Sequence, residues 1–204
     1  MLKTTAAIIN NDRNDACLSS TYSRLKAFTI LELLISVAVI AILTTIAVPS
    51  FNSIIAKTET TSAALTLHTT LKSARNHALS NQVIVIVCQA SHAEPSACHS
   101  ERERYANWQN GWISYADLNQ NNALDETDQI ISSHHSNSQI AVIFNQAGRL
   151  RFFPKGSARS AGFYFCNKAS PHTQYIRLLH TGRSRISRKL SASQRSKCQN
   201  QLKI

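Results

Sequence analysis

The C-terminal part of the chain carries the residues with the clearest chemistry, a block of basic side chains without any acid. The chain has 204 residues and a formal net charge of +11. From Arg149 to the C-terminus there are thirteen Lys and Arg residues and no Asp or Glu, whereas residues 28–148 hold five basic and nine acidic residues. Cations gathered in this way bind anions, most often nucleic-acid phosphates or a lipid surface.

One short motif inside this block has a spacing suited to phosphates. Gly182 permits a sharp turn, and an extended chain after it places Arg183 and Arg185 on one face, roughly 7 Å apart. This separation is comparable to one or two phosphate steps of a nucleic-acid strand. The planar guanidinium binds phosphate through two parallel hydrogen bonds. We therefore predict DNA contacts at five residues, which are Gly182, Arg183, Arg185, Arg188 and Lys189.

The basic residues also have a second interpretation. Residues 187–204 consist largely of Ser, Gln, Lys and Arg with few apolar side chains, a composition typical of a solvated or disordered tail. Lys168, Arg177 and His180 can extend a basic patch if the fold brings them to it. Tyr175 is expected to be a buried strand aromatic.

Acidic and amide side chains gather in a second segment, Asp117 to Asp128. Their spacing places oxygen ligands at positions 1, 3, 5, 9 and 12 of a calcium loop, namely Asp117, Asn119, Asn121, Asp125 and Asp128. Position 6, however, is Asn122 instead of glycine, and position 12 is the shorter Asp. We therefore expect an Asx-rich turn between two strands and no metal site, with calcium binding as the open alternative. The neighbouring His134 and His135 are expected in an exposed turn.

Four cysteines follow the first apolar segment, and an even number suggests disulfides in an oxidising compartment. Four cysteines allow three pairings. We favour Cys88–Cys98, which closes a loop, together with Cys166–Cys198, which fastens the C-terminal segment to the domain. Zinc is the weaker alternative because the chain has no Cys-x-x-Cys pair among them.

The elements that must carry these residues begin with an apolar segment, Phe28 to Val48. Its 21 residues contain one ionisable side chain, Glu32, and as a helix they span about 30 Å, the thickness of a bilayer core. Arg24 and Lys26 precede it, which favours a cytoplasmic N-terminal side. A carboxylate inside such a segment is costly unless it is paired, so Glu32 is a functional candidate.

The helix is expected to continue to about Asn81, because apolar residues recur there at three- and four-residue steps. After Asn81 the pattern changes to short β-branched and aromatic runs separated by Gly, Pro, Asn or Ser, which is typical of antiparallel strands. Seven such runs are predicted, at residues 83–88, 111–116, 129–132, 140–144, 150–153, 163–166 and 175–179. The expected fold class is α+β, a long N-terminal helix packed on an antiparallel sheet.

The segment Ala27-Phe28-Thr29-Ile30-Leu31-Glu32-Leu33-Leu34, preceded by basic residues, resembles the assembly signal of type IV pilins and type II secretion pseudopilins. This resemblance implies a leader, residues 1–27, which a prepilin peptidase removes between Ala27 and Phe28. It also implies methylation of the Phe28 amine and pairing of Glu32 with the N-terminus of another subunit. Ala27 departs from the family, which has Gly there, and slower processing is a consequence to test.

The head resembles the FimT/GspH minor pilins in Trp108-Gln109-Asn110-Gly111-Trp112, in Gly148 with Pro154 and Gly156, and in Gly162-Phe163-Tyr164-Phe165-Cys166. Gly182-Arg183-Ser184-Arg185 matches their Gly-Arg-x-Arg motif, which is associated with DNA binding in natural transformation. The resemblance implies a type IV pilin fold with a pilin helix at residues 28–81, a transmembrane segment at 28–48 and a β-rich head at 82–204.

The implied function is that of a minor pilin that binds DNA without sequence specificity, since no groove-reading helix is predicted. The alternative is a structural pseudopilin for pilus assembly or type II secretion. The implied partners are other pilin subunits, the prepilin peptidase, DNA and, before assembly, the inner membrane, with the head in the periplasm. We expect no enzymatic activity and no cofactor, because no nucleophile–base pair, paired catalytic carboxylates or cofactor motif is present.

Overall fold

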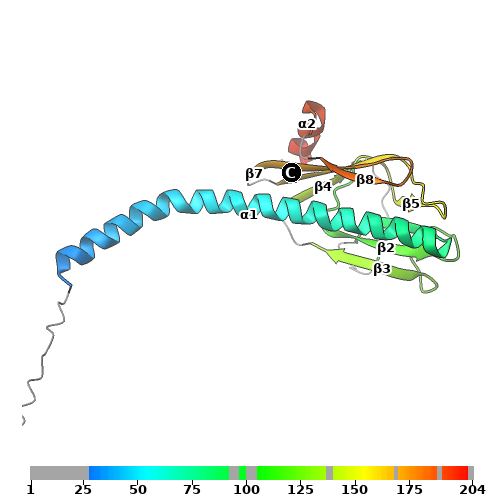
Figure 1. Cartoon of the computed structure of the whole chain (residues 1–204), viewed down its shortest axis with the longest axis horizontal. Coiled ribbons are helices and arrows are strands. Elements are labelled where there is room, and N and C mark those ends of the chain that lie inside the picture. The colour runs from blue at the N-terminus through cyan, green and yellow to red at the C-terminus, as the bar shows by residue number, and fades with distance from the viewer. Residues whose placement is uncertain are drawn as a thin grey trace, which may run out of the picture. The chain divides into compact units, whose positions relative to one another are not determined.

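The structure, a computed structural model, describes residues 28–91, 97–99, 105–136, 140–167, 170–187 and 190–201 (Figure 1). Side chains are not described for 46–50 and for the single positions 170, 199 and 201. The predicted leader, with Ala27, lies outside the described residues, as do Lys168, Arg188 and Lys189. The chain divides into two units, Met1–Leu43 and Thr44–Ile204, and each is described by itself.

The first unit contains the start of helix α1 (Ile30–Asn81). Thr29 caps this helix, because its hydroxyl accepts the Glu32 N–H at 3.2 Å and its carbonyl accepts the Leu33 N–H at 3.1 Å. Such a cap satisfies N–H groups that the first helical turn leaves without partners. Every side chain from Phe28 to Leu43 is exposed, so the apolar surface of this unit is uncovered in the isolated chain.

No helix among the residues with described side chains is both long enough and apolar enough to cross a membrane. The predicted transmembrane segment, residues 28–48, stays a prediction.

The second unit is built on the remainder of α1. One stripe of this helix is buried, with residues at three- and four-residue steps as the sequence predicts, namely Ala64, Leu67, Leu71, Ala74 and Ala78. The helix ends at Asn81, the expected position, and Gln82 then takes a positive φ of 56°. A left-handed residue directly after a helix is a common way to end it.

The strands form two antiparallel sheets of four. The first has the order β3-β2-β1-β5 and the second has the order β4-β6-β7-β8. The strands of the first sheet are β1 (Ile84–Gln89), β2 (Gly111–Asp117), β3 (Gln129–His135) and β5 (Leu150–Phe152). Those of the second sheet are β4 (Ile140–Phe144), β6 (Ala161–Asn167), β7 (Ser170–Leu178) and β8 (Ser184–Ser187). The α+β class, with a helix on antiparallel sheet, is therefore confirmed.

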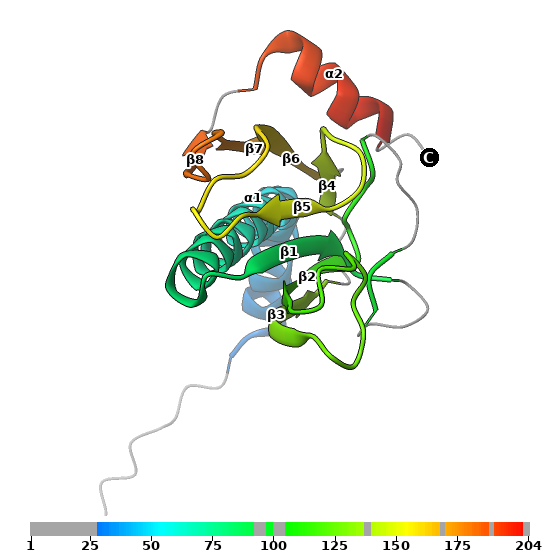
Figure 2. The same ribbon diagram turned by 90° about the vertical axis from the view of Figure 1, so that its right-hand side faces the viewer.

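Both sheets pack on the same helix, and Figure 2 shows them curving around one side of α1. The main core joins the α1 stripe to Val85 and Phe152 of the first sheet and to Phe163 and Ile176 of the second. Trp108, which precedes β2, belongs to this core, and its ring centroid lies 5.1 Å from that of Phe163. Burying many such side chains, each contributing about 1.5–3 kcal/mol, fixes the sheets on the helix.

Two segments differ from the sequence expectation. Residues 192–201, expected in a solvated or disordered tail, form helix α2 (Ala192–Gln201). The helix starts with a reciprocal cap in which the Gln194 N–H donates to the Ser191 hydroxyl and the Ser191 N–H donates to the Gln194 amide. His134 and His135, expected in a turn, lie in β3, where His134 stacks on the Trp112 ring at 4.4 Å between centroids.

Two disulfides join elements of the second unit. Cys88 is bonded to Cys98, with 5.7 Å between Cα atoms, and Cys166 is bonded to Cys198, with 5.9 Å. These are the pairings that the sequence analysis favoured. Cys198 belongs to α2 and Cys166 to β6, so the second bond holds α2 against the outer face of the second sheet, where Leu190 is also buried. This attachment explains why a polar segment stays folded there.

Candidate nucleic-acid interface

Strands β7 and β8, with the loop 179–183 between them, form a hairpin that we call the basic hairpin. The Leu179 N–H donates to the Arg183 carbonyl and the Gly182 N–H donates to the Leu179 carbonyl, both at 2.9 Å. Gly182 has a φ of 73°, a left-handed conformation that glycine adopts at little cost. The predicted turn at Gly182 is therefore present, and it places Arg183 directly before the edge strand β8.

The surroundings of Gly182 leave no room for a side chain. A Cβ atom at this position would overlap the carbonyl oxygen of Gly156 and would press on the Arg75 side chain at 3.1 Å. Nearby, the Ala158 N–H donates to the His180 carbonyl at 3.0 Å. The loop of the basic hairpin is thus packed closely against the turn that follows β5.

Arg75 of α1 holds this loop in place. Its Nε–H lies 3.1 Å from the Gly156 carbonyl and 3.2 Å from the Thr181 carbonyl, and donates to both. One helical side chain therefore joins α1, the turn after β5 and the basic hairpin. Arg75 lies outside the buried stripe of α1, and a helical sequence pattern does not show which loop such a residue meets.

A groove lies between α1 and β8, and we call it the basic groove. Its volume is about 340 Å³, and its lining residues are Lys72, Arg75, Asn76, Gly182, Arg183, Ser184 and Arg185. None of these residues is acidic. The sequence analysis did not include Lys72 and Arg75 in this site.

The two arginines of the motif alternate with inward-facing residues. Arg183 and Arg185 are exposed, whereas Ser184 and Ile186 are partly buried, so both arginines face outward as predicted. Within the described part of the chain, no hydrogen bond or ion pair involves their guanidinium groups. Arg177 lies directly opposite Arg185 in the register of β7 and β8 and is also exposed. Three guanidinium groups are therefore available to an anionic partner on one edge of the sheet.

Tyr175 brings an aromatic ring to the same outer face. It is half-buried, lies over Gly162, and stacks on Tyr164 with 5.2 Å between ring centroids. Burial raises the pKa of the Tyr175 hydroxyl, and the charge of Arg177 opposes that rise. The ring is thus less buried than the sequence analysis expected, and it lines a small pocket of about 180 Å³ together with Arg177.

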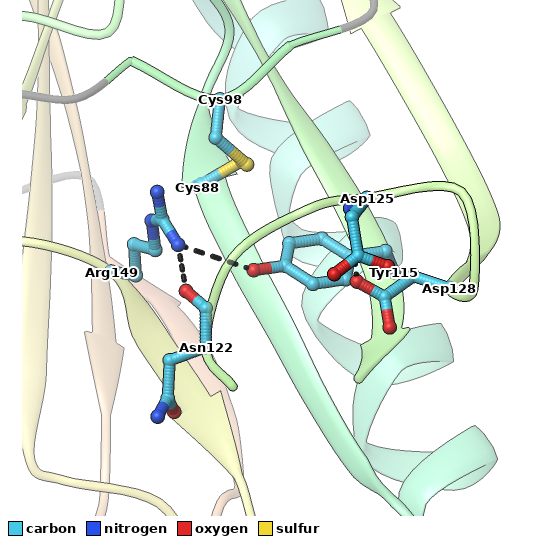
Figure 3. Close-up of a disulfide and its surroundings, with 7 residues drawn as sticks. All are labelled: Cys88, Cys98, Tyr115, Asn122, Asp125, Asp128 and Arg149. Carbon is cyan, nitrogen blue, oxygen red and sulfur yellow. Dashed lines mark hydrogen bonds between the residues drawn. A yellow bond between two sulfur atoms is a disulfide. The ribbon is translucent and has the colours of Figure 1, made fainter. Parts of the chain in front are cut away.

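A second basic pocket, of about 590 Å³, lies beside β5 and is lined by Arg149, Arg151 and Arg159 among others. Two of these guanidinium groups are engaged within the chain. Arg159 donates to the Ala147 carbonyl at 2.9 Å, and Arg149 donates to the Asn122 carbonyl and to the Tyr115 hydroxyl (Figure 3). Their cations therefore serve mainly to fasten loops, in contrast to Arg183 and Arg185.

This geometry suits phosphate groups better than base edges. The exposed guanidinium groups of Arg183, directly before β8, and of Arg185, in β8, lie across the groove from Lys72, and no acidic residue lines the groove. Such a surface attracts a phosphate backbone through charge and hydrogen bonds. Contacts to phosphates carry no information about the base sequence.

Two family models match the chain. The model described as "Type II transport protein GspH" matches residues 63–182, more than half of the chain, and the "Prokaryotic N-terminal methylation motif" matches residues 23–48. No curated protein is significantly similar to the chain. Two crystal structures of the Pseudomonas aeruginosa type IV minor pilin FimU, in space groups P65 and P21, are similar to it. They have 16% and 17% identity and a TM-score of 0.44 each, and they cover 62% and 65% of this chain and 91% and 90% of theirs.

Proposed function

Because this chain belongs to the GspH family of type II transport proteins and carries the N-terminal methylation motif, we propose that it is a minor pilin that binds DNA. In this function it is part of a type IV pilus and supports DNA uptake in natural transformation. It contacts DNA non-specifically, through phosphates, at Gly182, Arg183 and Arg185, with Arg188 and Lys189 extending the contact. The role is structural and non-catalytic.

The observation that carries this proposal is the basic groove. Arg183 and Arg185 project from a hairpin whose loop is fastened to α1, and Lys72 adds a cation from across the groove. Because the backbone that carries these cations is held on rigid elements, little loop ordering opposes binding. Tyr175, half-buried beside Arg177, offers a ring surface for an unpaired base.

DNA titrations of the full purified chain in mild detergent test this proposal. Labelled duplex and single-stranded DNA are titrated by fluorescence anisotropy at several salt concentrations. The double variant Arg183→Gln with Arg185→Gln is expected to bind about tenfold more weakly at low salt, since two charge-assisted contacts are lost. The slope of log K against log salt should also become shallower by about 1.8, which corresponds to two phosphate contacts.

The matched control removes the same charge elsewhere. Arg151→Gln with Arg195→Gln changes two exposed arginines, one in β5 and one in α2, outside the basic groove. This variant should keep most of the affinity. Equal losses in both variants would show that DNA senses only the net charge, and unchanged binding in the first variant would contradict the assignment of the basic hairpin.

The apolar start of α1 supports the membrane and assembly part of the proposal. Its side chains from Phe28 to Leu43 are exposed in the isolated chain, and an uncovered apolar surface of this kind is buried in lipid or against other subunits. We assign residues 28–48 as a single span with the head in the periplasm, cleavage between Ala27 and Phe28, methylation of Phe28, and assembly through Glu32.

Glu32→Gln tests the assembly role separately from the helix cap. The arrangement Thr29-x-x-Glu32 is a capping box, and glutamine also serves at its fourth position. The variant should therefore keep the helix start but lose the charge that pairs with another subunit's N-terminus. Loss of filament incorporation with normal membrane levels supports pairing, whereas normal incorporation would contradict it.

A second candidate is a structural pseudopilin of type II secretion or pilus assembly that does not bind DNA. The description of the matching family, a type II transport protein, favours it. Deletion of the gene followed by separate assays of piliation, secretion and DNA uptake distinguishes the two. Loss of secretion with normal DNA uptake would favour the pseudopilin.

A further inference from the structure

The face of the second sheet that points away from α1 carries aromatic rings beside arginines. In the register of its strands, Tyr164 lies opposite Tyr175, Gly162 opposite Arg177, and Arg177 opposite Arg185. Alternate residues of a strand share a face, so Tyr175 and Arg177 lie on the same face of β7, roughly 7 Å apart. We call the surface formed by Tyr164, Tyr175, Arg177 and Arg185 the outer platform.

Tyr175 is the ring of the outer platform that a partner can reach. The residues between the platform positions, such as Phe163 and Ile176, are buried in the core against α1, so Tyr175 faces away from that helix. Helix α2 packs on β4 and β6, and Figure 2 shows β8 at the opposite edge of this sheet. Tyr164 is only 4% exposed, whereas Tyr175 is half-buried.

Gly162 allows the Tyr175 ring to lie close to the backbone of the sheet. A Cβ atom at Gly162 would come within 2.7 Å of the ring carbon Cε2 and 2.8 Å of the hydroxyl oxygen. Gly162 is not among the residues with a positive φ, so its backbone conformation alone does not call for glycine. Glycine inside a strand often marks such a close approach. The ring, supported by Gly162 and Tyr164, is therefore held in place before any ligand binds.

A pocket of about 180 Å³ lies beside this ring, with Tyr175, Arg177 and Asn145 among its lining residues and no acidic residue. The Asn145 Oδ1 accepts the Gly162 N–H at 2.8 Å, so the amide nitrogen is the part of this side chain that remains. Its N–H groups have no hydrogen bond within the described part of the chain. Amide and guanidinium donors suit the carbonyl and ring-nitrogen acceptors of nucleobases.

The neighbouring arginines supply contacts for the backbone of the same strand. Arg177 and Arg185 are exposed and directly opposite each other. A nucleotide can therefore place its base at the Tyr175 ring and its phosphate at these guanidinium groups. In a duplex the faces of each base are covered by its neighbours, whereas an unpaired strand can present a base to an aromatic side chain.

We propose that the outer platform binds an unpaired nucleobase of single-stranded DNA, stacked on Tyr175 with its edge at Asn145 and its phosphates on Arg177 and Arg185. This inference rests on the proposed DNA-binding function and adds a contact that duplex DNA does not make. Stacking on an aromatic ring tolerates every base, so the site remains non-specific in sequence. Duplex DNA is bound through phosphate contacts alone.

A comparison of single strands with and without bases tests the proposal on the natural full chain in mild detergent. Fluorescence anisotropy measures binding of a labelled oligo-dT, of an abasic strand of equal length and of a duplex, all at one low salt concentration. The oligo-dT is expected to bind about five- to tenfold more tightly than the abasic strand, because both carry the same phosphates. Equal affinities would overturn the base contact and leave the proposed function standing. Absence of binding to all three would overturn both.

Two variants of Tyr175 locate the contact. Tyr175→Leu should weaken oligo-dT binding about fivefold and leave the affinities for duplex and abasic DNA unchanged, since only the stacking ring is lost. The matched control Tyr175→Phe keeps the ring and should keep all three affinities. Equal losses for duplex and oligo-dT in Tyr175→Leu would show that the ring only supports the hairpin, and would refute the site. If Tyr175→Leu does not fold, the comparison of oligo-dT with the abasic strand decides.

Discussion

The loop that joins β2 to β3, residues 117–128, which we call the acidic loop, and the basic hairpin are both turns at sheet ends, but their charged groups are used differently. In the acidic loop the carboxylates accept hydrogen bonds from the loop's own N–H groups, as Asp125 and Asp128 do. In the basic hairpin the guanidinium groups of Arg183 and Arg185 are exposed and make no hydrogen bonds within the described residues. The acids therefore build the conformation of their own turn, whereas the two arginines keep their hydrogen-bond donors exposed.

Each turn is nonetheless braced by one arginine from another element. Arg75 of α1 donates to the Gly156 and Thr181 carbonyls at the basic hairpin, and Arg149 donates to the Asn122 carbonyl and the Tyr115 hydroxyl at the acidic loop. A positive charge on a side chain is therefore not enough to identify a residue that binds a partner. Arg75, Arg149 and Arg159 hold the fold, whereas Arg183 and Arg185 are free of such bonds.

The largest expected effect is at Gly182, a left-handed position of the basic hairpin, and Asn122, a left-handed position of the acidic loop, serves as its comparison. Gly182→Ala should destabilise the chain by about 2–4 kcal/mol, because the Cβ atom adds backbone strain and meets the Gly156 carbonyl. Asn122→Gly should change stability by less than about 1 kcal/mol, since its conformation suits both residues. Guanidinium unfolding followed by the fluorescence of the buried Trp108 and Trp112 measures both. Similar losses in the two variants would contradict the crowding at Gly182.

The next largest effects on stability are expected from the two arginines that brace the turns. Arg75→Ala and Arg149→Ala should each cost about 1–3 kcal/mol, because each leaves two oxygen atoms without a donor. Only Arg75→Ala should also weaken DNA binding, since it releases the loop that presents Arg183. The same unfolding experiment combined with the anisotropy titration separates the two effects. Loss of DNA binding in Arg149→Ala would contradict the expectation that only the basic hairpin contacts DNA.

A smaller effect concerns the tyrosines beside each turn. Burial raises the pKa of Tyr115 to about 12, opposed by Arg149, and burial also raises the pKa of Tyr175. Between pH 10 and 12 the unfolded chain therefore loses the Tyr115 proton first, and the free energy of unfolding falls as pH rises. Tyr115→Phe should remove more of this fall than Tyr175→Phe in unfolding measured at pH 9 to 12. If the free energy of unfolding fell equally steeply with pH in both variants, the stronger burial of Tyr115 would be contradicted.

The smallest expected effect is on stability in the DNA-binding variant. Arg183→Gln with Arg185→Gln should change the free energy of unfolding by less than about 0.5 kcal/mol, because both side chains are exposed and neither guanidinium has a hydrogen bond to lose within the described residues. This result, with reduced DNA affinity, would show that these arginines act only on a partner. A loss above about 1 kcal/mol would mean that they support the fold.

The sequence predicted the helices and strands better than the contacts between them. Periodicity marked the buried stripe of α1 from Ala64 to Ala78, and β-branched runs marked strands such as β4, because these patterns arise from local geometry. Gly182 signalled its turn for the same reason. Lys72 and Arg75 were missed as neighbours of Arg183 because a helical pattern shows which face is apolar and not which loop crosses the other face.

Helix α2 was missed for a different reason. Its residues are polar, so composition suggested a solvated tail, and its attachment comes from the Cys166–Cys198 bond and from Leu190. The local signal was the capping pair Ser191 and Gln194, the first and last residues of a Ser-x-x-Gln pattern that begins a helix. The acidic loop was read correctly as a turn, but the burial of Asp117 depends on the packing of β2 and is not encoded in the loop's own residues.

The Cys166–Cys198 bond encloses β7, β8 and their turn, within a sequence separation of 32 residues. Arg183 and Arg185 are exposed inside that closed loop, where a protease that cleaves after arginine can reach them. A single cut there would leave both fragments covalently joined, so the nicked protein would run as one intact chain on a gel without reductant. Preparations of this protein should therefore be checked under reducing conditions before a loss of DNA affinity is attributed to any substitution.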